Sequence, residues 1–281
     1  MHLKLIMRDW FIEYYNGTAL MIKIKKLLYE HKGLQHIQIF ETVDFGKMLV
    51  LDGKIQLTER DEAFYHEMLV HPAMIMHENP SKVLIIGGGD GGAAREVLKH
   101  DPREVIIVEI DKDVIEYCKK YIGIDKGSLE DERVTIVNED GFEFVKNTDE
   151  VFDVIIVDST DPVSTSKSLI SEEFYLNCGK ISDYFVTQSQ SPFIQQEYFK
   201  TIIKNAKFKN KKVYLGYVPT YPLGLWSFLI ASNKRDIKLD LEVIRERFQN
   251  RQIKTVYYTP ELHIAAFELP KWLNEMINNL K

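Results

Sequence analysis

A run of glycines interrupted by one aspartate constrains this chain more than any other segment. Residues 87–92 read Gly-Gly-Gly-Asp-Gly-Gly and separate the apolar run 83–86 from a segment of helical composition. A buried strand that breaks into glycines and then opens a helix brings bare backbone against a ligand at the helix N-terminus. The pattern predicts a nucleotide-type pocket in which Gly87, Gly88 and Gly89 approach the ligand.

The aspartate in this run, Asp90, changes the kind of ligand that is expected. Glycine-rich turns of this type usually cradle anionic groups, and a fixed carboxylate there would repel them. Asp90 therefore indicates a ligand that carries positive charge. Taken alone, the run is also compatible with a plain tight turn, so the surrounding strands have to decide.

Three further apolar segments, 105–111, 134–138 and 154–157, each lead into acidic residues. Short apolar strands that alternate with amphipathic helices are typical of a doubly wound α/β domain. Ligands of such sheets lie outside the carboxyl ends of the strands. We expect four side chains to converge on one crevice there: Asp90, Glu109, Asp140 and Asp158.

Two of these acidic segments have alternative interpretations. Glu109 occupies the place where a carboxylate usually accepts hydrogen bonds from ribose hydroxyls, about twenty residues after the glycines. Asp111 is more typical of a helix cap. Asp158 and Asp161 stand at the end of the fourth strand, before Pro162. An Asx turn would account for one of these two acids, but two acids are more than a turn requires.

Composition and length limit the remaining possibilities. The 281 residues suffice for one large α/β domain and a smaller one. Alternating β-branched and aromatic residues before position 67 predict an antiparallel β domain over residues 1–66, followed by a catalytic domain over 67–281. The net charge of −6 argues against nucleic acid and suits a cationic substrate.

The chain shows no sign of a membrane, metal or extracellular setting. We see no membrane-length apolar run and no signal peptide, so a cytoplasmic location is expected. Cys118 and Cys178 lack the spacing of a metal site or a disulfide framework.

Several motifs in a fixed order resemble the polyamine aminopropyltransferase family, and spermidine synthase most closely. The matching segments are Leu51-Asp-Gly, Gln56-Leu-Thr-Glu-Arg-Asp-Glu62, Tyr65-His-Glu-Met68, the glycine run, Glu109-Ile-Asp111, Asp140-Gly141, Asp158-Ser-Thr-Asp-Pro162 and Pro219-Thr-Tyr-Pro222. The resemblance implies a class I methyltransferase-like Rossmann domain with a small N-terminal antiparallel β domain. It also implies an enzyme that transfers the aminopropyl group of decarboxylated S-adenosylmethionine to putrescine, giving spermidine and 5′-methylthioadenosine. It implies no cofactor and no metal, because the donor is a co-substrate, and it implies a homodimer or homotetramer.

The resemblance also assigns roles to individual residues. Asp158 matches the proton acceptor, and it would also contact the diamine. The donor would bind to Gln35, Gly87, Gly88, Gly89, Asp90, Glu109, Asp140 and Gly141. The acceptor would be bound by Tyr65, His66, Asp158, Asp161 and Tyr221.

Charge supports this interpretation independently. A carboxylate at position 90 would conflict with the methionine carboxylate of S-adenosylmethionine but can pair with the ammonium of the decarboxylated donor. An alkyl amine has a pKa of about 10.4, so a group such as Asp158 must take its proton before the nitrogen can attack.

Three points stay open at this stage. The family commonly has a proline in a mobile gate loop where this chain has Thr165, in Val163-Ser-Thr-Ser-Lys-Ser168. The acceptor could also be agmatine, cadaverine or spermidine, or putrescine could be methylated instead. A noncatalytic nucleoside-binding protein is the alternative of a different class, and Asp158, Asp161 and Tyr65 disfavour it.

Overall fold

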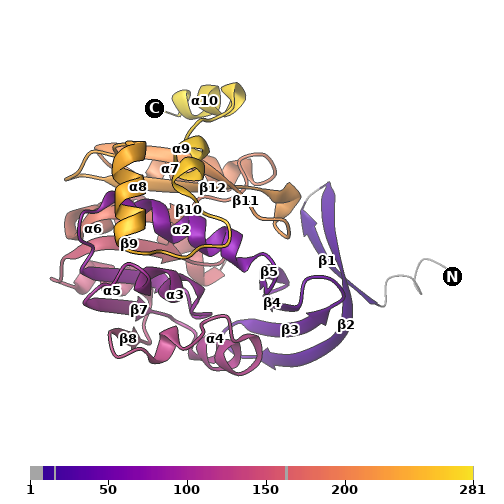
Figure 1. Ribbon diagram of the computed structural model, residues 1–281. Helices are drawn as coiled ribbons and strands as arrows, with labels where there is room; N and C mark the ends of the chain where they lie inside the picture. Colours follow the sequence, from indigo (N-terminus) through magenta and orange to yellow (C-terminus); the bar gives the residue numbers. More distant parts are fainter. Residues whose placement is uncertain (1–8, 16, 162–163, 281) are drawn as a thin grey trace.

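The computed structural model describes residues 9–15, 17–161 and 164–280, and it contains two sheets (Figure 1). The N-terminal sheet has five antiparallel strands in sequential order. This confirms the predicted antiparallel sheet. Its strands are β1 (Trp10–Tyr15), β2 (Thr18–Lys32), β3 (His36–Thr42), β4 (Lys47–Leu51) and β5 (Lys54–Thr58).

The second sheet has seven strands in the order β11-β12-β10-β9-β6-β7-β8. Strands β8, β7, β6, β9 and β10 run parallel, and β12 and β11 add an antiparallel pair. The predicted Rossmann-like fold and its antiparallel edge pair are both confirmed. The bounds are β6 (Lys82–Gly87), β7 (Glu104–Val108), β8 (Val134–Val137), β9 (Phe152–Asp158), β10 (Ser182–Gln188), β11 (Asn210–Tyr217) and β12 (Leu225–Ser232).

Helices cover both faces of this sheet (Figure 1). One face packs against α2 (Glu62–Met76), α3 (Gly92–Leu98), α8 (Leu241–Asn250) and α9 (Pro260–Ala266). The other face packs against α5 (Gly141–Asn147), α6 (Glu172–Ile181), α7 (Gln196–Asn205) and α10 (Lys271–Asn278). Shorter elements are α4 (Lys112–Tyr117), the π-helical turn η2 (Cys118–Ile122), and the 3-10 turns η3 (Ser128–Glu130), η4 (Ser164–Ile170) and η5 (Pro222–Gly224).

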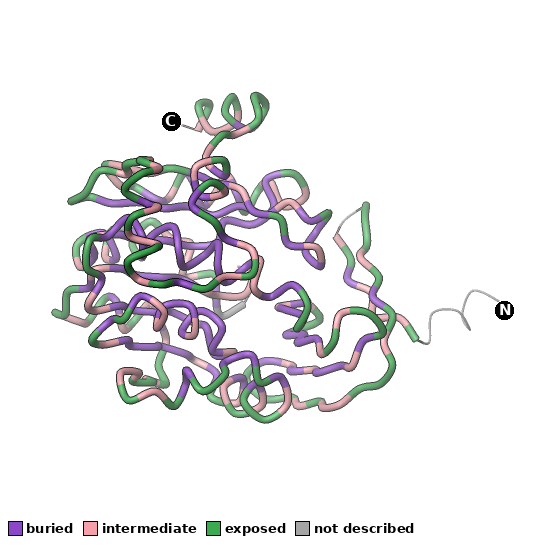
Figure 2. Tube along the Cα trace, in the orientation of Figure 1, coloured by how far each residue is buried: buried purple, intermediate pink, exposed green. Residues whose placement is uncertain are grey.

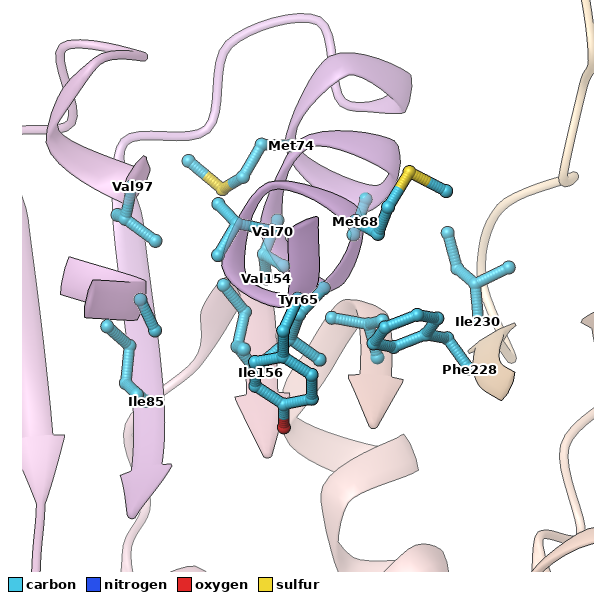
Figure 3. Close-up of a cluster of buried hydrophobic side chains, with 14 of the residues drawn as sticks. Tyr65, Met68, Val70, Met74, Ile85, Val97, Val154, Ile156, Phe228 and Ile230 are labelled. Atoms are coloured by element: carbon cyan, nitrogen blue, oxygen red, sulfur yellow. The ribbon is translucent and has the colours of Figure 1, made fainter. Parts of the chain in front are cut away.

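The middle residues of the central strands are apolar because both faces of the sheet are buried there. Val83 and Ile85 of β6 point into the cluster beneath α2, whereas Leu84 and Ile86 point into the cluster beneath α5 and α6. Parallel strands covered on both faces lose the polar alternation of a half-exposed sheet. Figure 2 shows the result as a buried central layer, and Figure 3 shows side chains of the cluster beneath α2.

The two sheets meet through α4 and η2. Val114, Cys118 and Ile122 from these turns pack against Ile37 and Leu49 of the N-terminal sheet. The domain boundary predicted after His66 falls inside α2, and β5 ends earlier, at Thr58. The antiparallel sheet and α2 are thus separated by a short turn.

The gate loop is described only in part. Residues 164–170 form the turn η4. Val163, and the side chain of Thr165, lie outside the described residues.

Candidate active site

A cavity of about 1090 Å³, counting the part open to solvent, lies at the carboxyl ends of β6, β7 and β9. This is the point where the strand order reverses direction around β6, and ligands bind there in open α/β sheets. The cavity is lined by every residue that sequence reasoning assigned to the site. They are Gln35, Tyr65, His66, Gly87, Gly88, Gly89, Asp90, Glu109, Asp140, Gly141, Asp158, Asp161 and Tyr221.

The glycine run forms a tight turn that only glycine can follow. Gly87 and Gly88 have φ of 81° and 71°, and a Cβ at Gly87 would collide with the carbonyl oxygen of Asp158. Asp90 Oδ1 accepts a hydrogen bond from the Gly92 amide at 2.7 Å. Asp90 therefore shapes the loop as well as lining the cavity.

Glu109 lies at the end of β7, against the glycine loop. Its two oxygens accept hydrogen bonds from the amides of Gly89 (3.2 Å) and Asp111 (2.9 Å). Burial, above all, raises the pKa of Glu109 to about 7, in spite of these donors. Asp111 caps α4, as predicted, by accepting a hydrogen bond from the backbone amide of Asp113. Its second oxygen accepts a hydrogen bond from the backbone amide of Gln35 at 3.1 Å.

Asp140 and Gly141 also line the cavity, where Asp140 caps α5 and Gly141 is its first residue. Asp140 Oδ1 accepts the Phe142 amide at 2.8 Å and so caps the helix. A Cβ at Gly141 would collide with the Ile86 side chain. A residue with a side chain at position 141 could not bring α5 this close to β6.

Asp158 ends β9 and is the most unusual carboxylate of the site. Its Oδ1 accepts a hydrogen bond from the Tyr65 hydroxyl at 2.9 Å. Its Oδ2 is buried and, among the described residues, lacks a hydrogen-bond partner. Burial, followed by repulsion from Asp90, raises the pKa of Asp158 to about 6. An unpartnered buried carboxylate oxygen is costly in isolation and is suited to a cationic or proton-donating ligand.

Asp161 lies in the turn after β9, where its Oδ2 accepts the side-chain amide of Gln195 at 3.1 Å. Burial raises its pKa to about 6, and the nearby Lys54 acts in the opposite direction. The Tyr221 hydroxyl donates to the backbone oxygen of Gln56 at 2.6 Å. The ring of Tyr221 lies 5.5 Å from that of Tyr65, measured between centroids. These two aromatic rings form an apolar wall beside the acids.

His66 stands between the carboxylates. Its Nε2 lies 3.4 Å from Asp90 Oδ1 and 3.9 Å from Asp158 Oδ2, and its Nδ1 bonds Glu62 Oε2 at 2.8 Å. Burial lowers the pKa of His66, but Asp90 and Glu62 outweigh it and raise the pKa well above its usual value. The spacing of Nε2 and the two carboxylates would admit a small cation. A protonated imidazole has no lone pair to offer a metal, so this trio is better suited to binding amines.

A second group of possible metal ligands lies at the opposite end of β9. His77 Nε2 is 3.6 Å from both Asp153 Oδ1 and Asp183 Oδ2. His77 Nδ1 accepts the Asn79 amide, so Nε2 carries the proton, and Asp183 is already paired with Arg235. In this arrangement, His77 Nε2 has no lone pair to offer a metal.

The cavity also contains residues that sequence reasoning missed. Glu13, Tyr15 and Lys54 come from the N-terminal sheet, and Gln195 and Trp226 come from the catalytic domain. No local signal marks them: the first three reach the cavity only through packing of one sheet against the other, and Gln195 and Trp226 lie outside the motifs recognised in the sequence. A signal did exist for the partner of His66, since Glu62 precedes it by four residues on one face of a helix.

Comparison with known proteins decides the family. Residues 62–241 match the spermine/spermidine synthase domain, and residues 9–59 match the spermidine synthase tetramerisation domain. The chain belongs to the polyamine aminopropyltransferase family. A curated polyamine aminopropyltransferase from Archaeoglobus fulgidus is 54% identical over 269 residues, which are 95% of this chain and 98% of that protein.

Solved structures give the same result for this aminopropyltransferase. A spermidine synthase in complex with the transition-state analogue AdoDATO superposes with a TM-score of 0.92 at 38% identity, over 97% of this chain and 96% of the other. The spermidine synthase of Thermotoga maritima superposes with a TM-score of 0.88 at 38% identity, over 96% of this chain and 94% of the other. The predicted family, fold class and enzyme class are thus confirmed.

The search for membrane-spanning segments gave a negative result for the described part of the chain. None of its helices has both the length and the apolar character needed to cross a bilayer.

Proposed function

We propose that this aminopropyltransferase uses decarboxylated S-adenosylmethionine as donor and putrescine as acceptor, and makes spermidine and 5′-methylthioadenosine. The observation that carries the proposal is the pair of raised-pKa acids, Asp158 and Asp161, which face one cavity together with Asp90. Three carboxylates around one cavity are suited to two cationic substrates.

The donor would lie along the glycine loop. Its ribose hydroxyls would bind Glu109, its adenine would lie near Asp140 and Gly141, and Gln35 would contact the nucleoside. All four residues line the same cavity as Asp90. The ammonium of the aminopropyl group would pair with Asp90, and a donor that retained its carboxylate would be repelled there.

The transfer is an in-line displacement in which Asp158 takes the proton. The acceptor nitrogen attacks the methylene next to sulfur, the C–S bond breaks, and its electrons return to sulfur as a neutral thioether. The proton leaves the nitrogen for Asp158 Oδ2, the oxygen that lacks a partner among the described residues, and passes on to water. A carboxylate with a pKa of about 6 is a better proton acceptor than an ordinary aspartate and is still ionised at pH 7.5.

The far end of the cavity favours a short diamine. Asp161 can hold the second ammonium, beside Tyr65, His66 and Tyr221. Lys54 lies near Asp161 and is paired with Glu13 at 3.2 Å. An acceptor with a third ammonium would meet this lysine, and like charges in a partly dry cavity repel. The charge pattern therefore favours putrescine over spermidine.

We further propose that the reaction needs neither metal nor cofactor, because the sulfonium donor is already activated and leaves as a neutral thioether. A chelator should leave the rate unchanged.

We also propose a homodimer or homotetramer assembled through the N-terminal sheet. Tyr14, Met21 and Leu27 expose apolar surface there. Light scattering on a size-exclusion column tests the oligomeric state.

The decisive experiment is a product assay. Purified protein is incubated with decarboxylated S-adenosylmethionine and putrescine, cadaverine, agmatine or spermidine in turn, and the products are identified by mass. A parallel set uses S-adenosylmethionine to detect methylation. Spermidine from putrescine at the highest kcat/KM supports the proposal. A preferred acceptor other than putrescine, or a methylated product, contradicts it.

The role of Asp158 has its own test. Asp158→Asn keeps the shape and the Tyr65 contact but cannot take a proton, so turnover should fall by at least about 100-fold. Binding of methylthioadenosine, measured by calorimetry, should stay nearly unchanged. A variant with normal turnover would remove Asp158 from the proposed mechanism.

A further inference from the structure

A buried carboxylate behind the acceptor site bonds two cationic side chains at once. Glu62 Oε2 accepts hydrogen bonds from His66 Nδ1 at 2.8 Å and from Arg95 Nη2 at 2.8 Å. Its Oε1 accepts Arg95 Nη1 at 2.9 Å. None of these contacts is needed to bind the donor or the acceptor directly, because neither Glu62 nor Arg95 lines the cavity.

Local structure fixes this arrangement. Glu62 and His66 lie one turn apart on α2, and Arg95 lies on α3, directly after the glycine loop. Arg95 is also held by the Ile124 carbonyl oxygen (2.7 Å). Gly92 lets α3 approach the imidazole, since a Cβ at this position would collide with the ring.

The opposite edge of the imidazole faces the reaction site. The groups around His66 are Glu62 on its own helix, Asp90 in the glycine loop and Asp158 at the end of β9, and the Tyr65 ring lies 5.3 Å away. Three carboxylates surround one ring that is 1% exposed. Such a ring is held as a cation, and the cation neutralises part of the repulsion between Asp90 and Asp158.

We propose that Glu62 is a positioning residue for aminopropyl transfer, which holds His66 as a cation between Asp90 and Asp158 through its bond to Nδ1. The cation has two effects on the reaction. It keeps Asp158 ionised and able to take a proton. It also disfavours the extra proton on an amine bound at Asp158 Oδ2, which the carboxylate alone would stabilise. The inference rests on the proposed function of this site.

Removing the charge of Glu62 tests the idea. With Glu62→Gln, His66 should lose its proton near neutral pH. Burial and Asp90 should then raise the pKa of Asp158 further, because no cation opposes them. The acid limb of the plot of kcat against pH should move to higher pH by at least one pH unit. Turnover at pH 7 should fall at least about twofold and largely recover by pH 9. An acid limb that stays in place overturns the proposal.

A matched control lies on the same helix. Glu67 is even more deeply buried than Glu62 and accepts the backbone amides of Val256, Tyr257 and Tyr258, away from the cavity. Glu67→Gln removes a buried charge without touching His66, so its acid limb should coincide with that of the wild type. An equal shift in both variants would mean that lost helix stability, and not the charge on His66, moves the profile.

A spectroscopic readout separates this inference from the proposed function. Carbon-13 NMR of labelled histidines follows the protonation of each ring, and His66→Asn identifies the His66 signal by its loss. The pKa of the His66 ring should lie well above the usual histidine range in the ligand-free wild type, and it should fall clearly in Glu62→Gln, where one of the carboxylates that stabilise the cation is gone.

Each possible failure then has a distinct signature. If putrescine is not the acceptor, the product assay fails but the NMR result stands, and the pH profile is measured with the amine that is used. If Glu62→Gln does not fold, the wild-type titration still decides: a neutral His66 at pH 7 overturns the proposal.

Discussion

At the scale of single residues, Asp90 performs two tasks with one carboxylate. It turns the loop by accepting the Gly92 amide, and it lines the end of the cavity that we propose for the donor. Asp90→Asn can keep the first contact but loses the charge. A charge-assisted hydrogen bond contributes about 1.5 to 3 kcal/mol, so decarboxylated S-adenosylmethionine should bind roughly 10- to 150-fold more weakly. Methylthioadenosine, which lacks the ammonium, should lose little affinity in calorimetry. Equal weakening of both ligands would mean that Asp90 only shapes the loop.

Lys54 is expected to set acceptor length at the other end of the cavity. Its ammonium pairs with Glu13 and lies 4.6 Å from the centre of the Tyr15 ring. Lys54→Met removes the repulsion and uncovers the Glu13 carboxylate. The ratio of kcat/KM for spermidine to that for putrescine should rise about five- to tenfold, which corresponds to roughly 1 kcal/mol of charge interaction. Lys54→Arg serves as the control and should keep the wild-type ratio. A ratio that does not change in Lys54→Met would show that another feature limits acceptor length.

At the scale of elements, the packing of α3 against α2 positions the site and depends on one small residue. A Cβ at Gly92 would strike the His66 ring, which is pinned between carboxylates and cannot easily move. Gly92→Ala should therefore destabilise the protein by about 1 to 3 kcal/mol in urea unfolding and reduce turnover. Gly17→Ala is the comparison, because a Cβ there meets nothing within 4 Å. A Gly92→Ala variant with wild-type activity would show that His66 tolerates displacement.

The same element explains where sequence reasoning stopped. The glycine loop and the strands of the Rossmann sheet could be predicted, because each is a short apolar run that ends in polar residues. Helix α2 could not: thirteen of its fifteen residues are buried, so its apolar positions show no helical period, and Pro72 lies inside it. Glu62 and His66 were therefore read as parts of a motif, without the helix that joins them.

At the scale of the whole molecule, the sequence indicated the part of the site at the strand ends better than the part beside the N-terminal sheet. Asp90, Glu109 and Asp158 come from strand ends of one sheet, and the topology of parallel sheets brings such ends together. Glu13 and Lys54 come from a different sheet, and their place in the cavity depends on how α4 and η2 dock the two sheets. Long-range packing of this kind leaves no local pattern.

A site built from buried acids should also cost the free protein stability in a defined pH window. The pKa of Asp158 is raised from 3.8 to about 6, so the folded state holds a proton that the unfolded state releases between these values. Stability from this group is therefore lost as pH rises through the window, and the cost is complete above pH 6. At about 1.36 kcal/mol per pKa unit, this cost in stability amounts to about 3 kcal/mol.

Urea unfolding without ligands tests this cost. At pH 7.5 the unfolding free energy of Asp158→Asn should exceed that of the wild type by up to this amount. The gain should shrink steadily toward pH 4.5, because the wild-type carboxyl is then mostly neutral. Asp153→Asn, at the opposite end of the same strand, is the control that should show no such gain. If the difference in unfolding free energy between Asp158→Asn and the wild type does not vary with pH, the pKa of Asp158 is not raised in the ligand-free site.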